Sequence, residues 1–136
     1  MKQDPENTGN APIKLTFHKE ERLCSKKIIE KLFLEGKTFL TFPIKVVYIQ
    51  NPVPSKFPVQ AGFSVGKKIF KRAVHRNFIK RRMREAYRLN KNELYLQMGD
   101  KQMAVFFIFV GKTIPEYALI ESTMKKSIKK LINEIS

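Results

Sequence analysis

The segment Gly66–Lys91 reads GKKIFKRAVHRNFIKRRMREAYRLNK and carries most of the chain's excess charge. Its last twenty-five residues hold eleven Lys and Arg against one acid, Glu85, which is a net +10 of the chain's formal +15. The part from Ala73 to Leu89 contains no Gly or Pro and is rich in residues that favour helices. We therefore expect one strongly cationic helix, presented by the rest of the chain.

At about 100° per residue, this helix has two distinct faces. The apolar side is expected to hold His75, Ile79, Met83, Ala86 and Tyr87, of which His75 and Tyr87 are interpreted as core or boundary residues. A separate arc of about 100° holds Asn77, Lys80, Arg81, Arg84 and Arg88. Like charges four residues apart, such as Lys80 and Arg84, repel each other, so the arc predicts a polyanionic ligand.

The composition indicates one folded domain with an anionic partner. The chain has 136 residues, of which 43% are hydrophobic, and its pI is near 10.1, as in proteins that bind nucleic acid or anionic membranes. The longest apolar run, Met103–Val110, is far shorter than the about 20 residues that span a bilayer, so no membrane partner is expected. The N-terminal MKQDPENTGNAP lacks the apolar core of a signal peptide, which favours a cytoplasmic location.

Few side chains are suited to catalysis. Cys24 is the single cysteine, which fits a reducing compartment, and the chain has two histidines, His18 and His75. These residues supply neither a zinc-ligand set nor a nucleophilic triad. We therefore expect no catalytic residue and no metal site on the protein itself.

The two ends of the chain differ in character. Residues 1–20 are interpreted as a flexible N-terminal tail, because the segment is polar and begins without periodicity, and residues 21–136 as the folded domain. A first helix is expected between the cap Ser25 and Gly36, and a last helix after Pro115. The first helix places Ile28, Ile29, Leu32 and Phe33 at helical spacing.

Three other segments predict strands. Phe39–Gln50 and Phe57–Val65 are aromatic and β-branched, and the proline-containing turn between them predicts a hairpin. Met103–Val110 is apolar without alternation, which predicts burial on both faces of a sheet. The connection through the basic helix is long enough for a parallel crossover. The expected order is α-β-β-α-β-α, in a single-domain α/β sandwich with a small mixed sheet.

From Gly62 to Arg88 the sequence resembles the protein subunit of bacterial ribonuclease P. In that family a strand ends in V-x-K-K, and after a short loop a helix carries the pattern R-A-x-x-R-N-x-x-K-R-x-x-R-E. Those positions are occupied here by Val65, Lys67, Lys68, Arg72, Ala73, Arg76, Asn77, Lys80, Arg81, Arg84 and Glu85. Phe78 departs from the pattern, since many members carry a second arginine there in an R-N-R signature. A weaker likeness extends over about residues 20–134.

The resemblance implies an α+β sandwich of the ribosomal protein S5 domain 2-like class. Its four-stranded mixed sheet would contain a left-handed β-α-β crossover through the basic helix, whereas physical rules alone favour a right-handed one. Four strands would require Phe39–Gln50 to be broken in two near Pro43.

The resemblance also implies a function. Ribonuclease P is an endoribonuclease that removes the 5′ leader of precursor tRNA to make the mature tRNA 5′ end. The implied partners are the catalytic RNA and the precursor tRNA, with no protein partner required. Catalysis is expected to reside in the RNA subunit, which holds most of the Mg²⁺, and the protein alone is expected to bind no cofactor.

Two sets of binding residues follow from this likeness. Contacts to the catalytic RNA are expected from Lys67, Lys68, Arg72, Arg76, Asn77, Lys80, Arg81, Arg84 and Arg88. Contacts to the leader are expected in a cleft between the first helix and the sheet, from Ile29, Phe33, Tyr48, Phe63 and Ser64. The spacing of Ile29 and Phe33 also suits an ordinary core stripe, so packing stays open as an alternative for these two.

Two other classes of protein fit the charge. A ribosomal or RNA-chaperone-type binding module with no associated reaction needs the same cationic helix, and only the motif spacing favours ribonuclease P over it. A DNA-binding module is disfavoured, because the basic helix is expected between strands rather than after a short helix and turn.

Overall fold

An aromatic segment that the residue pattern predicts as one strand is divided at Pro43 into two, as the family resemblance implies. In the computed structural model, which describes residues 17–135, β1 spans Lys37–Thr41 and β2 spans Ile44–Gln50. The two strands pair antiparallel, with the last residue of β1 opposite the first residue of β2. Pro43 has no N–H to donate to a strand ladder, which favours its place in the turn.

The sheet has the strand order β1-β2-β4-β3, with β3 at Val59–Val65 and β4 at Met103–Phe109. β4 is antiparallel to β2 and parallel to β3. The predicted hairpin between β2 and β3 is therefore wrong, because β4 lies between them. Residues 51–58 contain three prolines, which cannot donate to a ladder, and β4 is apolar along its whole length, which suits the centre of a sheet.

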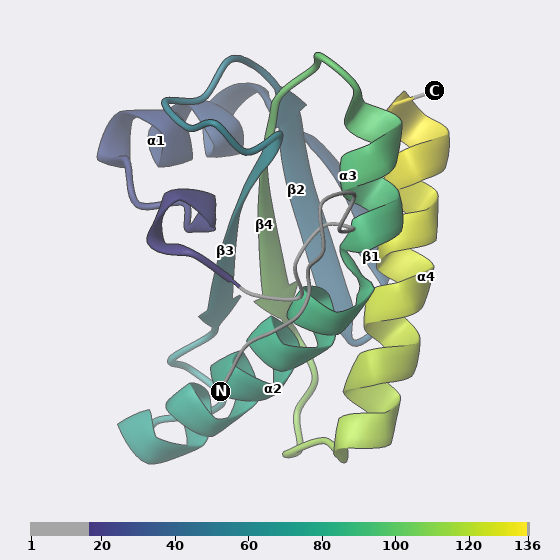
Figure 1. Cartoon of the computed structure of the whole chain (residues 1–136). Helices are drawn as coiled ribbons and strands as arrows, with labels where there is room; N and C mark the ends of the chain where they lie inside the picture. The colour runs from purple at the N-terminus through teal and green to yellow at the C-terminus, as the bar shows by residue number, and fades with distance from the viewer. Residues whose placement is uncertain (1–16, 136) are drawn as a thin grey trace, which may run out of the picture.

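Two helices form the connection from β3 to β4. α2 spans Ala73–Asn90, and α3 spans Asn92–Met98, where the sequence predicted only a polar loop. α3 exists because Leu94, Tyr95 and Met98 give it an apolar side, which is buried. In Figure 1, β3 and β4 both point downward, β4 lies to the right of β3, and α2 and α3 lie on the viewer's side of the sheet. The parallel crossover is therefore left-handed.

Helices cover both faces of the sheet (Figure 1). α2, α3 and α4, which spans Tyr117–Ile135, pack on one face and form the larger core. α1, at Lys26–Glu35, packs on the other face and forms the smaller core. Strand side chains alternate between the two cores, so that Val46 and Tyr48 of β2 belong to the larger core and Val47 to the smaller.

The start of the described chain is held by a buried ion pair. Of the predicted tail, residues 1–16 lie outside the described residues, and the rest leads into a 3-10 helix, η1, at Lys19–Glu21. The Glu21 carboxylate contacts Nζ of Lys91 and accepts a hydrogen bond of 2.5 Å from the Tyr95 hydroxyl. Burial lowers the pKa of Lys91, and the contact with Glu21 opposes that shift. This pair joins η1 to the junction of α2 and α3.

Candidate RNA-binding surface

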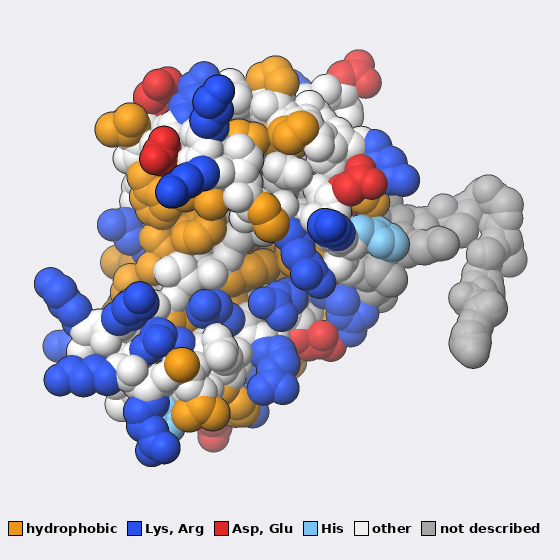
Figure 2. All heavy atoms as spheres, turned by 90° about the vertical axis from the view of Figure 1, so that its left-hand side faces the viewer, with side chains coloured by type: hydrophobic (Ala, Val, Ile, Leu, Met, Phe, Trp, Pro, Cys, Tyr) orange, Lys and Arg blue, Asp and Glu red, His pale blue; other side chains and the backbone are white. Residues whose placement is uncertain are grey.

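The predicted RNA-binding cations lie on α2 and on the loop before it. Residues 66–72 form this loop, because β3 ends at Val65 and α2 begins at Ala73. Lys67, Lys68, Arg72, Asn77 and Arg81 are exposed, and Arg76, Lys80, Arg84 and Arg88 are half-buried. Figure 2 shows a dense group of Lys and Arg side chains on the lower part of one face, where Figure 1 places the start of α2. Lys71, which the prediction omitted, is exposed in the same loop.

Most of these cations have no carboxylate partner within residues 17–135. The exception is Arg88, whose Nη2 lies 2.6 Å from Oε2 of Glu85. The hydrogen bond from Arg88 lowers the pKa of the Glu85 carboxyl, and the same bond raises the pKa of Arg88. Lys80 and Arg84 lie about one helical turn apart, and neither forms an ion pair in the described chain. Their repulsion is therefore uncompensated there, and a bound polyanion would relieve it.

Arg76 holds the loop in place. Its Nη1 donates hydrogen bonds to the carbonyl oxygens of Phe70, at 2.7 Å, and Lys71, at 2.9 Å. On the other side of the loop, the buried ring of Phe70 packs against that of Phe109 in β4, with centroids 6.0 Å apart. The structure thus gives one guanidinium nitrogen of Arg76 a role within the fold, in addition to the phosphate contact that the sequence predicts.

Phe78, the departure from the family pattern, lies on the side of α2 that faces the start of α4. Its ring is half-buried, and the guanidinium carbon of Arg82 lies 4.4 Å from the ring centroid. The same carbon lies 6.0 Å from the ring centroid of Tyr117. Both distances are in the range of cation–π interactions, so Phe78 has a packing partner at the edge of the cationic surface.

Three of the predicted leader residues lie on the face of the sheet that α1 covers. They are Ile29 and Phe33 of α1 and Ser64 of β3. The ring of Phe33 meets that of Phe106 edge to face, with centroids 5.4 Å apart, and 50% of Phe33 is exposed. Figure 2 views the molecule from the side of α1 and the start of α2, and an apolar strip lies there above the Lys and Arg group.

Phe106 and Ile108 of β4 belong to the same surface, although the sequence did not single them out. Phe106 lies opposite Gly62 and Ile108 lies opposite Ser64 in the parallel register. A Cβ added at Gly62 would lie 2.1 Å from the ring of Phe106, so glycine is what allows the ring to approach β3. A glycine inside a strand is a recognised sign of such a close approach, and Gly62 was the available signal.

Tyr48 and Phe63 lie on the opposite face of the sheet, so the expectation that all five leader residues line one cleft is wrong. Tyr48 is buried, and its hydroxyl donates a hydrogen bond of 2.9 Å to Oε1 of Glu134 in α4. Burial, together with the contact to Glu134, raises the pKa of Tyr48 to about 12. Phe63 stacks on Phe107 with ring centroids 5.6 Å apart. Side chains along a strand alternate between the two faces of the sheet, and both residues are at positions that face the larger core.

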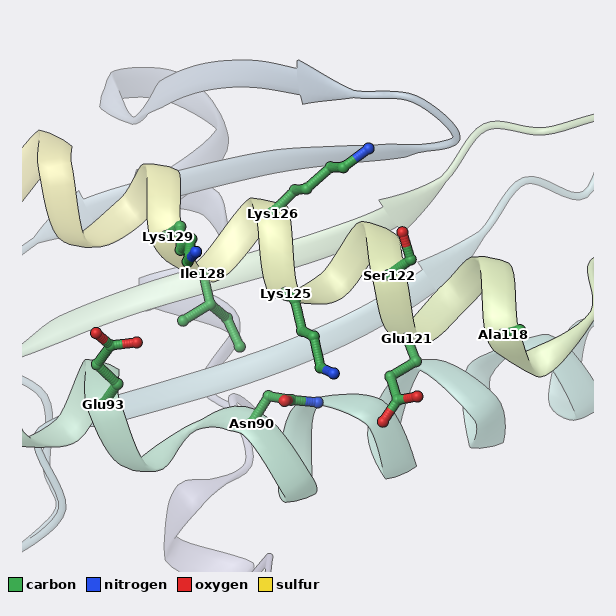
Figure 3. Close-up of a pocket in the computed structure, with 9 residues that line it drawn as sticks. All are labelled: Asn90, Glu93, Ala118, Glu121, Ser122, Lys125, Lys126, Ile128 and Lys129. Atoms are coloured by element: carbon green, nitrogen blue, oxygen red, sulfur yellow. The ribbon is translucent and has the colours of Figure 1, made fainter.

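A separate groove of about 460 Å³ lies between α4 and the end of α2 with α3 (Figure 3). Lys125 and Glu121 of α4 point toward Asn90 of α2, and Glu93 of α3 also lines the groove. Cations and carboxylates are mixed around it, and no residue of the predicted RNA-binding set lines it. The groove is therefore not part of the candidate surface.

Within residues 17–135, no three His, Cys, Asp or Glu side chains form a group that could hold a metal ion. Cys24 is an exposed free thiol. In the same part of the chain no helix is both long and apolar enough to cross a membrane.

Comparison with known proteins identifies relatives across nearly the whole described chain. Residues 17–135 match the family model described as Ribonuclease P. The ribonuclease P protein component of Porphyromonas gingivalis is 35% identical over 127 residues, which cover 92% of this chain and 93% of that protein. The corresponding protein of Chlorobaculum tepidum is 34% identical over 119 residues, which cover 79% of this chain and 77% of the relative.

Solved structures share the fold. The ribonuclease P protein from Thermotoga maritima aligns with a TM-score of 0.64 at 23% identity, covering 81% of this chain and 96% of that one. A ribonuclease P protein from Staphylococcus aureus aligns with a TM-score of 0.61 at 21% identity, covering 82% of this chain and 94% of that one. At these identities the structures show the common α+β architecture.

Proposed function

Because this chain belongs to the ribonuclease P protein family, we propose that it binds the catalytic RNA of ribonuclease P and assists removal of the 5′ leader from precursor tRNA. The observation that carries the proposal is the exposed group of cations on α2 and its loop, which lacks carboxylate partners in the described chain. The group lies beside an apolar strip on the same face (Figure 2).

The cationic surface supports contact with phosphates of a folded RNA. The planar guanidinium groups of Arg72 and Arg81 can each donate two parallel hydrogen bonds to one phosphate, and Lys67 and Lys68 add point charges. Each neutralised phosphate releases condensed counterions, so affinity falls as salt concentration rises. The buried side of α2 holds the helix against β3 and α4, which keeps these charges at fixed spacing.

The apolar strip under α1 supports binding of a single strand. Aromatic rings with an exposed edge or face, such as Phe33 and Phe106, offer stacking surfaces for unpaired bases. Ile29 and Ser64 lie on the same face of the sheet, and the cations beside the strip are placed for the phosphates of that strand. We assign the leader to this face, without Tyr48 and Phe63.

We assign the cleavage chemistry to the RNA subunit. Mg²⁺ held mainly by that RNA would supply a metal-activated water for attack on the phosphodiester. The part proposed for this chain is to neutralise RNA phosphates and to hold the leader, which raises the affinity of the complex for its substrate.

Reconstitution tests the proposal. The purified chain is added to the ribonuclease P RNA of the same genome, with precursor tRNA at low Mg²⁺, and the rate of 5′ cleavage is measured. We expect a clear increase over the RNA alone. RNA binding without any increase would contradict the proposal and favour the ribosomal or chaperone-type alternative, which has no associated reaction.

A further inference from the structure

A second, smaller pocket lies at the edge of the cationic surface, between α2 and the start of α4. It is lined by Phe78, Arg81, Arg82, Glu85 and Tyr117 and has a volume of about 320 Å³. This volume is at the lower end of the range for sites that hold a small organic group. None of the predicted leader residues lines this pocket, so it is separate from the surface assigned to the leader.

Two polar atoms of the pocket residues lack hydrogen-bond partners. Nε of Arg82 and the hydroxyl oxygen of Tyr117 are buried, and neither has a partner within the described chain. Buried polar groups are rarely left unsatisfied, because each one costs free energy of desolvation. Arg82 also forms no ion pair with residues 17–135. Arg82 and Tyr117 therefore bring unused hydrogen-bonding capacity to the lining of the pocket.

The shape of the side chains indicates a flat ligand. The Arg82 guanidinium lies over the Phe78 ring and within cation–π distance of the Tyr117 ring, so a planar cation and two aromatic rings lie together at the pocket, and we call this group the platform. Unpaired bases stack on aromatic rings and on arginine planes in this way. Arg81, which is exposed, supplies a cation at the rim, while Glu85 is already bonded to Arg88.

From these observations we propose that the pocket binds one unpaired nucleotide of the RNA partner, with its base on the platform of Phe78, Arg82 and Tyr117 and its phosphate on Arg81. The inference rests on the proposed function, because the nucleotide belongs to the RNA that the cationic surface binds. In this proposal Phe78 contributes a base contact at the edge of the cationic surface.

Binding to the ribonuclease P RNA of the same genome tests the inference through a change that removes no charge. Phe78→Leu removes the aromatic ring, so we expect affinity to fall about 5- to 160-fold with the salt dependence unchanged. Arg81→Ala is expected to lower the log–log salt slope by about 0.7 to 0.9, as one lost phosphate contact. Phe78→Tyr should keep the affinity of the unmodified chain, since tyrosine retains the aromatic stacking surface.

Leu119→Ala is the matched control. Leu119 is exposed on α4 two residues after Tyr117 and does not line the pocket, so its removal should leave affinity unchanged. Thermal unfolding monitored by circular dichroism shows which variants are folded. Photocrosslinking of the unmodified chain to the RNA gives a second measurement, and we expect a crosslink from Phe78 or Tyr117 to an unpaired nucleotide.

The outcomes separate this inference from the proposed function. Equal affinity of the folded Phe78→Leu variant and the unmodified chain, or crosslinks confined to other parts of the surface, would overturn the nucleotide pocket alone. If the unmodified chain fails to bind the RNA, the proposed function and the pocket are both wrong.

Discussion

Nη1 of Arg76 lies 2.7 Å from the carbonyl oxygen of Phe70, and this bond joins the cationic helix to the loop before it. Arg76→Lys keeps the charge, but its side chain is shorter, so we expect its ammonium to lose the bonds to the carbonyl oxygens of Phe70 and Lys71. We expect faster hydrogen exchange in residues 66–72 and a loss of about 1 kcal/mol in the free energy of unfolding. Arg81→Lys is the control, because Arg81 is exposed and forms no such bond with any residue from 17 to 135. Equal exchange rates in the two variants would contradict the role of Arg76.

Phe33 and Tyr48 were first assigned to one cleft, but they lie on different faces of the sheet, so their substitution should affect leader binding differently. Phe33→Ala removes an exposed ring on the face of the sheet that α1 covers and should weaken leader binding by about 1 to 3 kcal/mol. Tyr48→Phe should leave leader binding unchanged, because Tyr48 faces α4. The measurement is the ratio of affinities of the reconstituted complex for precursor tRNA with and without a leader. A larger loss in Tyr48→Phe than in Phe33→Ala would reverse the assignment of the faces.

Tyr48 also predicts a dependence of stability on alkaline pH. Its pKa is raised from 10.0 to about 12 in the folded chain, so the unfolded chain loses this proton first. The stability that the hydroxyl contributes is therefore fully present below pH 10 and is lost as pH rises toward 12. We expect the unmodified chain to lose unfolding free energy relative to Tyr48→Phe over this interval, in urea titrations at matched pH. A difference that stays constant with pH would contradict the raised pKa.

The close approach of Phe106 to Gly62 predicts a coupled pair of substitutions. Gly62→Ala places a methyl group 2.1 Å from a ring atom and should lower the free energy of unfolding by about 1 to 3 kcal/mol. In a Phe106→Ala background the same change should cost much less, because the ring is gone, and a double-mutant cycle measures the difference. Gly66→Ala is the control, since no atom of the described chain lies within 4 Å of a Cβ at that position. Additive effects at Gly62 and Phe106 would show that the Phe106 ring does not cause the loss of unfolding free energy in Gly62→Ala.

Local pattern was sufficient to predict α2 and its two sides. The helical periodicity placed Ile79, Met83, Ala86 and Tyr87 on the apolar side, and all four are buried. Capping residues gave the boundaries of α1, because Ser25 was predicted as its N-cap and Gly36 as its end, and both hold these positions. The break at Pro43 came from the family resemblance, since composition alone favoured one long strand.

Pairing between distant strands and the face of each strand residue were harder to predict. β4 inserts between β2 and β3 because of its apolar character on both sides, and no local turn encodes that neighbour. The alternation within β3 already grouped Phe63 with Val59, Ala61 and Val65, whose side chains are in the larger core. The family likeness nevertheless assigned Phe63 to the cleft together with Ser64, although adjacent strand residues face opposite sides.

The salt dependence of RNA binding tests the central claim most directly. Lys80→Ala with Arg84→Ala removes two neighbouring charges from α2, and Lys125→Ala with Lys129→Ala removes an equally spaced pair from α4. We predict that the α2 pair lowers the log–log slope by about 1.4 to 1.8, as two lost phosphate contacts, while the α4 pair leaves the slope unchanged. Equal decreases for the two pairs would mean that binding depends on net charge alone, and an unchanged slope for the α2 pair would contradict a phosphate-binding surface on this helix.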